Sequence, residues 1–190
     1  MSQTLGTGVS APCRCLLTFC AEVLQALQYI SSRRIVHRDI AARNVLLDAN
    51  ENCKLADFGL SVALGSIGKD YARLLEQLPI RHAAIEVLET GRFSAQSDTW
   101  SFGCLAWELF SVGADPYDGM ATLTEVASHV KSGGQLEVPL VHPADVHSRL
   151  KMPCWAGTPS DRPSFVALFS TAVELGAIPD PRPGLRCSYR

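Results

Sequence analysis

The segment between residues 37 and 60 constrains the fold more strongly than any other part of this chain. Two short apolar runs, Val45–Leu47 and Cys53–Leu55, are separated by Asp48-Ala-Asn-Glu-Asn52, a composition typical of a turn. Apolar runs on either side of a turn predict a β-hairpin. Because the strands of a hairpin are antiparallel, the residue that enters the first strand lies beside the residue that leaves the second.

Polar residues occupy both of those positions. Asn44 enters the first strand, Asp57 follows the second, and Asp39 lies on the loop just upstream. Carboxylate and amide oxygens suit a hard cation such as Mg²⁺, which binds few protein ligands and shares its other positions with phosphate and water. We expect Gly59 to permit a backbone turn that lets Asp57 face inward. The hairpin therefore predicts converging oxygen ligands.

The rest of the chain is predicted to be mainly α-helical. Residues 1–15 are expected to form a poorly ordered lead-in, and residues 176–190 a Pro-rich tail. Between them, apolar residues recur at helical spacing and indicate a helical bundle around one central buried helix. The predicted helices are Leu16–Ile30, the central Gln96–Ser111, Met120–Lys131, Pro143–Trp155 and Ser164–Leu175.

Charge and composition exclude several classes of protein. The net charge of −2 argues against a nucleic-acid partner, which needs a basic face. The seven cysteines lack the paired spacing of a zinc site and, without a secretory leader, are expected to be reduced thiols. No stretch approaches the roughly 20 apolar residues of a membrane span. We expect a cytoplasmic protein, or the cytoplasmic part of a receptor whose span lies outside these residues.

Each polar motif alone is more often an ordinary turn. Taken in order, His37-Arg38-Asp39, Asn44 and Asp57-Phe58-Gly59 resemble the signature of the protein kinase family. The resemblance covers residues 16–175 and is to the C-terminal lobe of the α+β protein kinase fold. It implies that Asp39 accepts the proton of the substrate hydroxyl, and that Asn44 and Asp57 hold the Mg²⁺ ions that bridge the phosphates of ATP.

The resemblance also implies a nucleotide contact and an aligned hydrophobic stack. Leu46 would pack under the adenine ring, while Asp57 would reach the nucleotide through its cation. His37 and Phe58 would be the two lower members of the stack that aligns an active kinase. A His and a Phe that merely pack in a core are compatible with the same pattern.

Three further residues are expected to hold the lobe together. By resemblance, Asp98 would anchor backbone amides of the catalytic loop, since a buried carboxylate requires such donors. Glu86 and Arg162 would form a buried ion pair, and removal of one partner would leave an uncompensated charge.

The catalytic loop resembles that of the tyrosine-specific kinases. Serine/threonine kinases place a Lys two residues after the catalytic Asp, whereas this chain has Ala41 there. In the tyrosine kinases an Arg takes over the electrostatic role of that Lys, and by resemblance this Arg would be Arg43. The alternative is that Arg43 is a solvated cation of the loop. Pro79 and Arg81 resemble the platform that cradles a substrate tyrosine.

The largest departure from the family lies upstream. A kinase requires a glycine-rich loop, a strand Lys and a helix Glu to act on ATP. The first Lys of this chain is Lys54, and Gly6-Thr7-Gly8 is too weak and too close to the catalytic loop to be the glycine-rich loop. We expect a C-terminal lobe without its N-terminal partner.

The activation segment also departs from the family. His82 stands where a Trp is expected and is interpreted as a tolerated substitution, Ile85 replaces a Pro, and Val62 replaces a basic residue. Tyr71 occupies the place of an activating phosphotyrosine, whose phosphate could order the loop against Arg38. An unmodified, exposed loop tyrosine is the alternative.

Three hypotheses follow. The chain is a truncated protein-tyrosine kinase whose parent transfers the γ-phosphate of ATP to protein tyrosine, with no measurable activity expected for residues 1–190 alone. Alternatively, it is a non-catalytic, pseudokinase-like interaction module. A third possibility is that the chain has no stable fold alone, because Leu46 and Phe58 would be exposed. The sequence leaves the substrate's identity and the oligomeric state open.

Overall fold

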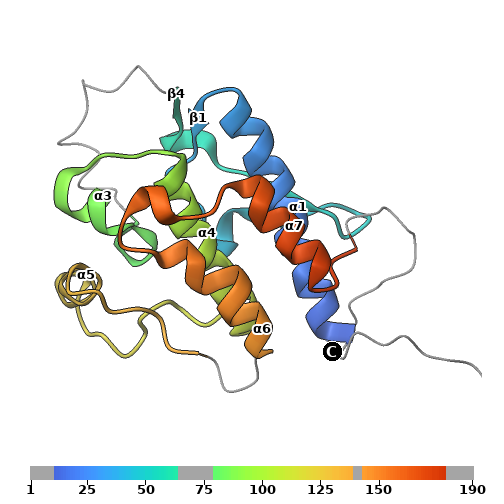
Figure 1. Cartoon of the computed structure of the whole chain (residues 1–190). Coiled ribbons are helices and arrows are strands. Elements are labelled where there is room, and N and C mark those ends of the chain that lie inside the picture. Colours follow the sequence, from blue (N-terminus) through green and yellow to red (C-terminus); the bar gives the residue numbers. More distant parts are fainter. Residues whose placement is uncertain (1–10, 64–78, 139–142, 179–190) are drawn as a thin grey trace, which may run out of the picture.

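The fold is mainly helical and is organised around one buried helix. The structure, a computed structural model, describes residues 11–63, 79–138 and 143–178. In α4 (Ala95–Phe110), twelve of the sixteen residues are buried, as predicted for the central helix. Figure 1 shows α4 passing through the middle of the molecule. The other helices are α1 (Ala11–Ser32), α3 (Ile85–Thr90), α5 (Leu123–Lys131), α6 (Ala144–Val146) and α7 (Phe165–Glu174).

Helix packing explains why the apolar stripes face inward. α7 lies along α1, α3 packs against α5, and both α1 and the chain segment after α6 contact α4.

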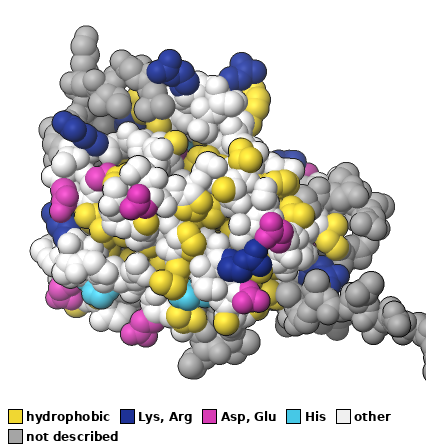
Figure 2. Space-filling model, viewed as in Figure 1, with side chains coloured by type: hydrophobic (Ala, Val, Ile, Leu, Met, Phe, Trp, Pro, Cys, Tyr) yellow, Lys and Arg dark blue, Asp and Glu magenta, His cyan; other side chains and the backbone are white. Residues whose placement is uncertain are grey.

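Basic and acidic side chains are interspersed on the face shown in Figure 2 and are not gathered by sign. Within the residues that the structure describes, no helix is both long and apolar enough to span a membrane.

The predicted hairpin is present with the predicted strands. β2 (Val45–Leu47) pairs antiparallel with β3 (Cys53–Leu55), so that Val45 lies opposite Leu55. The carboxylate of Asp48 closes the turn by accepting hydrogen bonds from the amides of Asn50 and Asn52 at 2.8 and 2.9 Å. Hydrogen bonds from Asn52 hold the pKa of Asp48 down at about 2.

A second pair of strands was not predicted. β1 (Ile35–Val36) pairs antiparallel with β4 (Val62–Ala63), and this pairing joins the start of the catalytic loop to the segment after Asp57-Phe58-Gly59. Strands of two residues are too short to show an alternating pattern, which is why the sequence does not reveal them. Val62, which stands where the family has a basic residue, is opposite Val36 in this pair.

Several predicted boundaries are wrong. α1 begins at Ala11, ahead of the predicted Leu16, so residues 11–15 belong to a helix and not to the lead-in. The buried stripe begins with Cys13, because a thiol packs like a small apolar group. Cys15 is disulfide-bonded, contrary to the expectation of reduced thiols, which Cys13, Cys20, Cys53, Cys104 and Cys154 meet.

The predicted helix Pro143–Trp155 is divided into three short pieces. α6 is followed by a π-helical turn, His147–Lys151, and then by a 3-10 turn, Met152–Trp155, which contains Pro153. Proline cannot donate a helical hydrogen bond, so the regular helix does not continue through it. The wider π turn directs Lys151 into the core.

Lys151 is fully buried beneath this turn. Its ammonium lies 5.6 Å from the centre of the Phe110 ring, and Nζ has no hydrogen-bond partner within the residues that the structure describes. Burial lowers the pKa of Lys151 to about 8, because removal from water disfavours the charged form. This side chain therefore destabilises the fold in its protonated state.

We predict that Lys151→Met stabilises the lobe by about 1–3 kcal/mol, because the substitution removes a buried unsatisfied donor. The pKa of Lys151 is lower in the folded chain than in the unfolded chain, so the unfolded state binds more protons between about pH 8 and the ordinary lysine value. The gain should be largest at or below pH 8 and shrink as the pH rises above it. Urea unfolding at several pH values measures this. The exposed Lys131→Met is the control, and an equal response of both variants would contradict the prediction.

Candidate active site

The catalytic loop is fastened to α4 by the carboxylate of Asp98. Its oxygens accept hydrogen bonds from the backbone amides of His37 and Arg38 at 2.7 and 3.0 Å. Asp98 is only 2% exposed, and this burial raises its pKa to about 7, opposed by the two amide bonds and by the Arg38 guanidinium. Arg38 has a left-handed backbone, φ 72°, which costs about 1–2 kcal/mol for a residue with a side chain. The two hydrogen bonds offset that strain and fix the direction in which the loop leaves β1.

Asp39 lies between two donors from the next turn. Arg43 Nη2 contacts Oδ1 of Asp39, and Asn44 Nδ2 donates to Oδ2 at 2.8 Å and to the Asp39 carbonyl at 2.7 Å. Asp39 and Asn44 are buried, whereas the Arg43 side chain is 53% exposed. Because both groups facing the Asn44 amide accept hydrogen bonds, Nδ2 must point toward Asp39. The amide oxygen of Asn44 is then left to accept other ligands.

The hairpin brings Asn44 and Asp57 together at the level of the backbone. The amide of Ala56 donates to the carbonyl of Asn44 at 2.8 Å, so Asp57 follows directly beside the first strand. The Asp57 side chain is exposed, and its Oδ1 accepts from the Gly59 amide at 3.2 Å. The expectation that Asp57 faces inward is not met, because its side chain is exposed to solvent.

The expected role of Gly59 also needs correction. The left-handed backbone belongs to Asp57, with φ 58° and ψ 73°, and not to Gly59. A Cβ on Gly59 would lie 3.1 Å from Oδ1 of Asp57, which is tighter than an ordinary contact. Gly59 is therefore needed for its small size, because that allows the carboxylate to reach its amide.

His37 connects the catalytic loop to Phe58. The two rings lie 4.8 Å apart, tilted by 59°, and His37 Nε2 is 3.1 Å from the carbonyl of Ala56. Since a carbonyl can only accept, Nε2 carries the proton. Burial lowers the pKa of His37, so the ring is neutral at pH 7. Phe58 and Leu46 remain 44% and 56% exposed.

The residues of the predicted tyrosine platform follow the undescribed segment 64–78. Arg81 donates to the backbone carbonyls of Pro116 and Tyr117, the latter at 2.8 Å, so its guanidinium is used to hold a loop. Pro79 begins the 3-10 turn Ile80–His82. Tyr71 lies outside the described residues. Arg38, its expected phosphate partner, lies 4.9 Å from the centre of the Phe93 ring.

Sequence reasoning missed Glu108 and did not foresee its contact with His82. Glu108 is 8% exposed and accepts from the amide of Ala42 at 2.8 Å, and its Oε2 is 3.2 Å from Nε2 of the buried His82. The available signal was a charged residue in the apolar second half of α4, because such a residue requires a partner.

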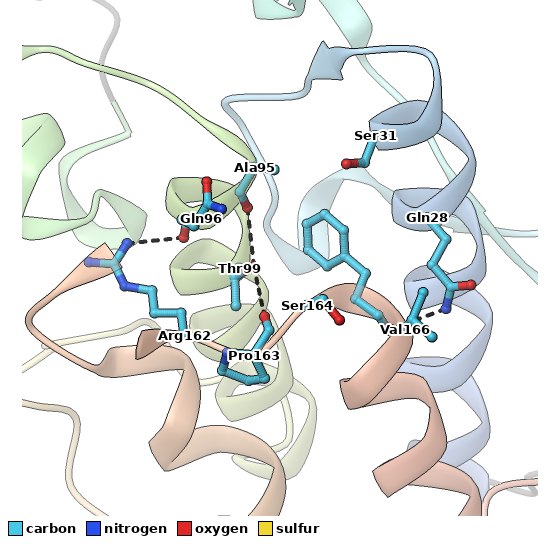
Figure 3. A pocket seen from close by; sticks show the side chains of 10 residues that line it. Gln28, Ser31, Ala95, Gln96, Thr99, Arg162, Pro163, Ser164 and Val166 are labelled. Carbon is cyan, nitrogen blue, oxygen red and sulfur yellow. Dashed lines mark hydrogen bonds between the residues drawn. The ribbon is translucent and has the colours of Figure 1, made fainter. Parts of the chain in front are cut away.

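Glu86 and Arg162 form the expected ion pair, in which the Glu86 side chain is 20% exposed. Both guanidinium nitrogens of Arg162 reach the carboxylate of Glu86 at 2.7 Å, and the Arg162 side chain is fully enclosed. Arg162 also donates to the carbonyl of Gln96, as Figure 3 shows, and lies 5.0 Å from the Trp100 ring centre. The open hollow beside it is lined by the ends of α1, α4 and α7 and includes none of the catalytic-loop residues.

The oxygen donors near the catalytic loop fit a hard divalent cation. Asn44 offers an amide oxygen and Asp57 an exposed carboxylate, and Mg²⁺ binds through one or two such groups together with phosphate. Across residues 11–63, 79–138 and 143–178, there is no cluster of three or more His, Cys, Asp or Glu side chains that could enclose a metal by itself. A cation here would take its remaining ligands from phosphate or water.

Comparison with known proteins identifies the class to which this fold and this loop belong. Residues 7–171 match the family described as protein tyrosine and serine/threonine kinase. The chain belongs to that protein kinase family, and the relatives it matches are tyrosine kinases.

Three relatives illustrate the similarity. The chain is 44% identical over 150 residues to the megakaryocyte-associated tyrosine-protein kinase of Rattus norvegicus, covering 79% of this chain and 31% of that protein. It is 40% identical over 163 residues to tyrosine-protein kinase Srms of Mus musculus, covering 80% and 30%. It is 36% identical over 161 residues to the vascular endothelial growth factor receptor kdr-like of Danio rerio, covering 84% and 12%. The chain thus matches about a third of these proteins' length, or less.

We predict that Asp98→Ala destabilises the lobe, because the amides of His37 and Arg38 lose their acceptor. The cost should be about 1–3 kcal/mol for each amide. Thermal or urea unfolding measures it, with Asp115→Ala at an exposed position as the control. If the two variants unfolded at the same urea concentration, Asp98 would not hold the loop.

Glu86→Gln should cost about 3–5 kcal/mol, because it leaves the enclosed Arg162 guanidinium without its counter-charge. Glu89→Gln, on the same helix but exposed, provides the matched comparison and should change stability little. Guanidinium chloride unfolding would reveal the difference. Equal midpoints for the two variants would show that the pair contributes nothing.

Proposed function

We propose that the protein to which this chain belongs transfers the γ-phosphate of ATP to tyrosine residues of proteins. The observation that carries the proposal is the arrangement at Asp39. Its carboxylate is held by Arg43 and Asn44 on a loop that α4 fixes through Asp98. Phosphoryl transfer depends chiefly on positioning and on electrostatic stabilisation, so a rigid loop of this kind suits it.

Asp39 orients the attacking hydroxyl and accepts its proton. Both carboxylate oxygens already accept hydrogen bonds, yet each retains a lone pair for a substrate O–H. Arg43, which is half-exposed, places a positive charge beside Asp39 where negative charge develops on the transferred phosphate. Asp39 thus accepts the proton, and Arg43 stabilises the charge, at one point of the loop.

Asn44 and Asp57 would hold the Mg²⁺ ions of an ATP complex. When bound, the metal neutralises charge on the phosphates. Asn44 keeps its amide oxygen available because its Nδ2 is committed to Asp39. Leu46 would lie beneath the adenine ring, and its exposure leaves an apolar surface for that contact.

Pro79 and Arg81 would support the tyrosine ring of a protein substrate. Arg81 is anchored to the loop at Pro116 and Tyr117, which gives the platform a fixed base. Tyr71 remains a candidate for regulatory phosphorylation, with Arg38 as the partner of its phosphate. We also propose that the protein acts in the cytoplasm, either as a soluble kinase or as the cytoplasmic part of a receptor.

Phosphate transfer requires the glycine-rich loop, the strand Lys and the helix Glu that a kinase carries in its N-terminal, or upper, lobe. Leu46 and Phe58 expose apolar surface on the side where such a lobe would sit. We therefore propose that residues 1–190 alone transfer no phosphate and that activity returns when an upper lobe is supplied.

The test is a chimera that joins this chain to the upper lobe of tyrosine-protein kinase Srms. We predict that it incorporates labelled phosphate from ATP into a poly-Glu/Tyr polymer, and that Asp39→Asn lowers the rate by about 10²–10⁴-fold because the proton acceptor is lost. Asp115→Asn, an exposed aspartate elsewhere, should leave the rate unchanged.

A non-catalytic interaction module is the second candidate. The departures at His82, Ile85 and Val62 favour it, as each replaces a residue that the family usually has. A chimera that folds and melts cooperatively but labels no tyrosine would support this module and contradict the kinase.

A further inference from the structure

Glu108 is a charged residue within the apolar central helix. It is 8% exposed, and its Oε2 accepts a hydrogen bond from the amide of Ala42 at 2.8 Å. Ala42 opens the 3-10 turn Ala42–Asn44, and the preceding Ala41 provides no side-chain acceptor to cap it. Glu108 therefore supplies, from α4, the cap that this turn lacks locally.

The same carboxylate oxygen faces a second segment of the chain. It lies 3.2 Å from Nε2 of His82, a residue that is 4% exposed. The backbone carbonyl of His82 in turn accepts a hydrogen bond from the Ser101 hydroxyl of α4 at 2.8 Å. The turn Ile80–His82 is thus tied to α4 through its backbone as well as approached by Glu108.

The ring nitrogen must carry a proton at this distance. A carboxylate oxygen and an unprotonated Nε2 would face each other with lone pairs only, which is repulsive. Nε2 makes no hydrogen bond of regular geometry within the described part of the chain. The contact with Glu108 at 3.2 Å is therefore a close polar approach and not a regular hydrogen bond.

We propose that Glu108 and His82 are positioning residues that hold the tyrosine platform, Pro79–His82, at a fixed place relative to the catalytic turn Ala42–Asn44. One carboxylate is shared by a donor from each segment, so displacement of either segment weakens the contact to the other. Both side chains are enclosed, and water cannot easily replace a lost partner. The role in placing a substrate rests on the proposed function, whereas the link between the two segments does not.

The experiment measures hydrogen exchange of the Ala42 amide by NMR in His82→Met and His82→Gln. Methionine fills the space without donating, whereas glutamine can place an N–H near the position of Nε2. The amides of His37 and Arg38, which are bonded to Asp98 on the same helix, correct for any change in global stability.

We expect the Ala42 amide in His82→Met to exchange about tenfold faster relative to those two amides, because Glu108 loses the contact that holds its carboxylate in place. In His82→Gln the ratio should stay within about twofold of the unaltered chain. An unchanged ratio in His82→Met, or a glutamine variant that behaves like the methionine variant, would overturn the proposal.

A second measurement needs no variant. A long-range ¹H–¹⁵N spectrum of the unaltered chain at pH 7 should show Nε2 of His82 protonated, and an unprotonated Nε2 would refute the shared contact. Neither measurement involves phosphate transfer, so failure of this proposal is distinguishable from failure of the proposed function.

Discussion

The carboxylate of Asp98 is the interaction on which the rest of the site depends. It is almost fully buried in α4 and receives the amides of His37 and Arg38. A buried carboxylate without donors would be very costly, and two buried amides without an acceptor would be costly as well. Each group therefore requires the other, and this mutual requirement fixes the catalytic loop on the buried central helix.

The geometry at Asp39 follows from that anchor. The loop leaves Arg38 with a left-handed backbone, and the turn Ala42–Asn44 brings Arg43 and Asn44 back onto the Asp39 carboxylate. Glu108, at the other end of α4, accepts the amide that opens this turn. The central helix thus holds the loop at both ends, which explains why polar residues persist in a helix that is otherwise apolar.

Much of the lobe could be predicted from the sequence, because its signals are local. The hairpin is encoded in two apolar runs and the Asp48 turn, and the central helix in a pattern that is apolar on most of its sides. Contacts that depend on distant residues could not be predicted in this way. The pairing of β1 with β4 and the approach of Glu108 to His82 join segments that no periodicity connects. The π turn that buries Lys151 is also invisible, since a regular helical pattern continues through it.

The two faces of the site differ in how complete they are. Toward α4 the amides of His37, Arg38 and Ala42 have acceptors, whereas Leu46 and Phe58 are about half exposed. The most direct test of this account is residue-resolved hydrogen exchange on the isolated 190-residue chain. If α4 alone organises the loop, the amides of His37 and Arg38 exchange about as slowly as those of the α4 core. Exchange at these two amides as fast as in exposed turns, while the α4 amides stay protected, would contradict it.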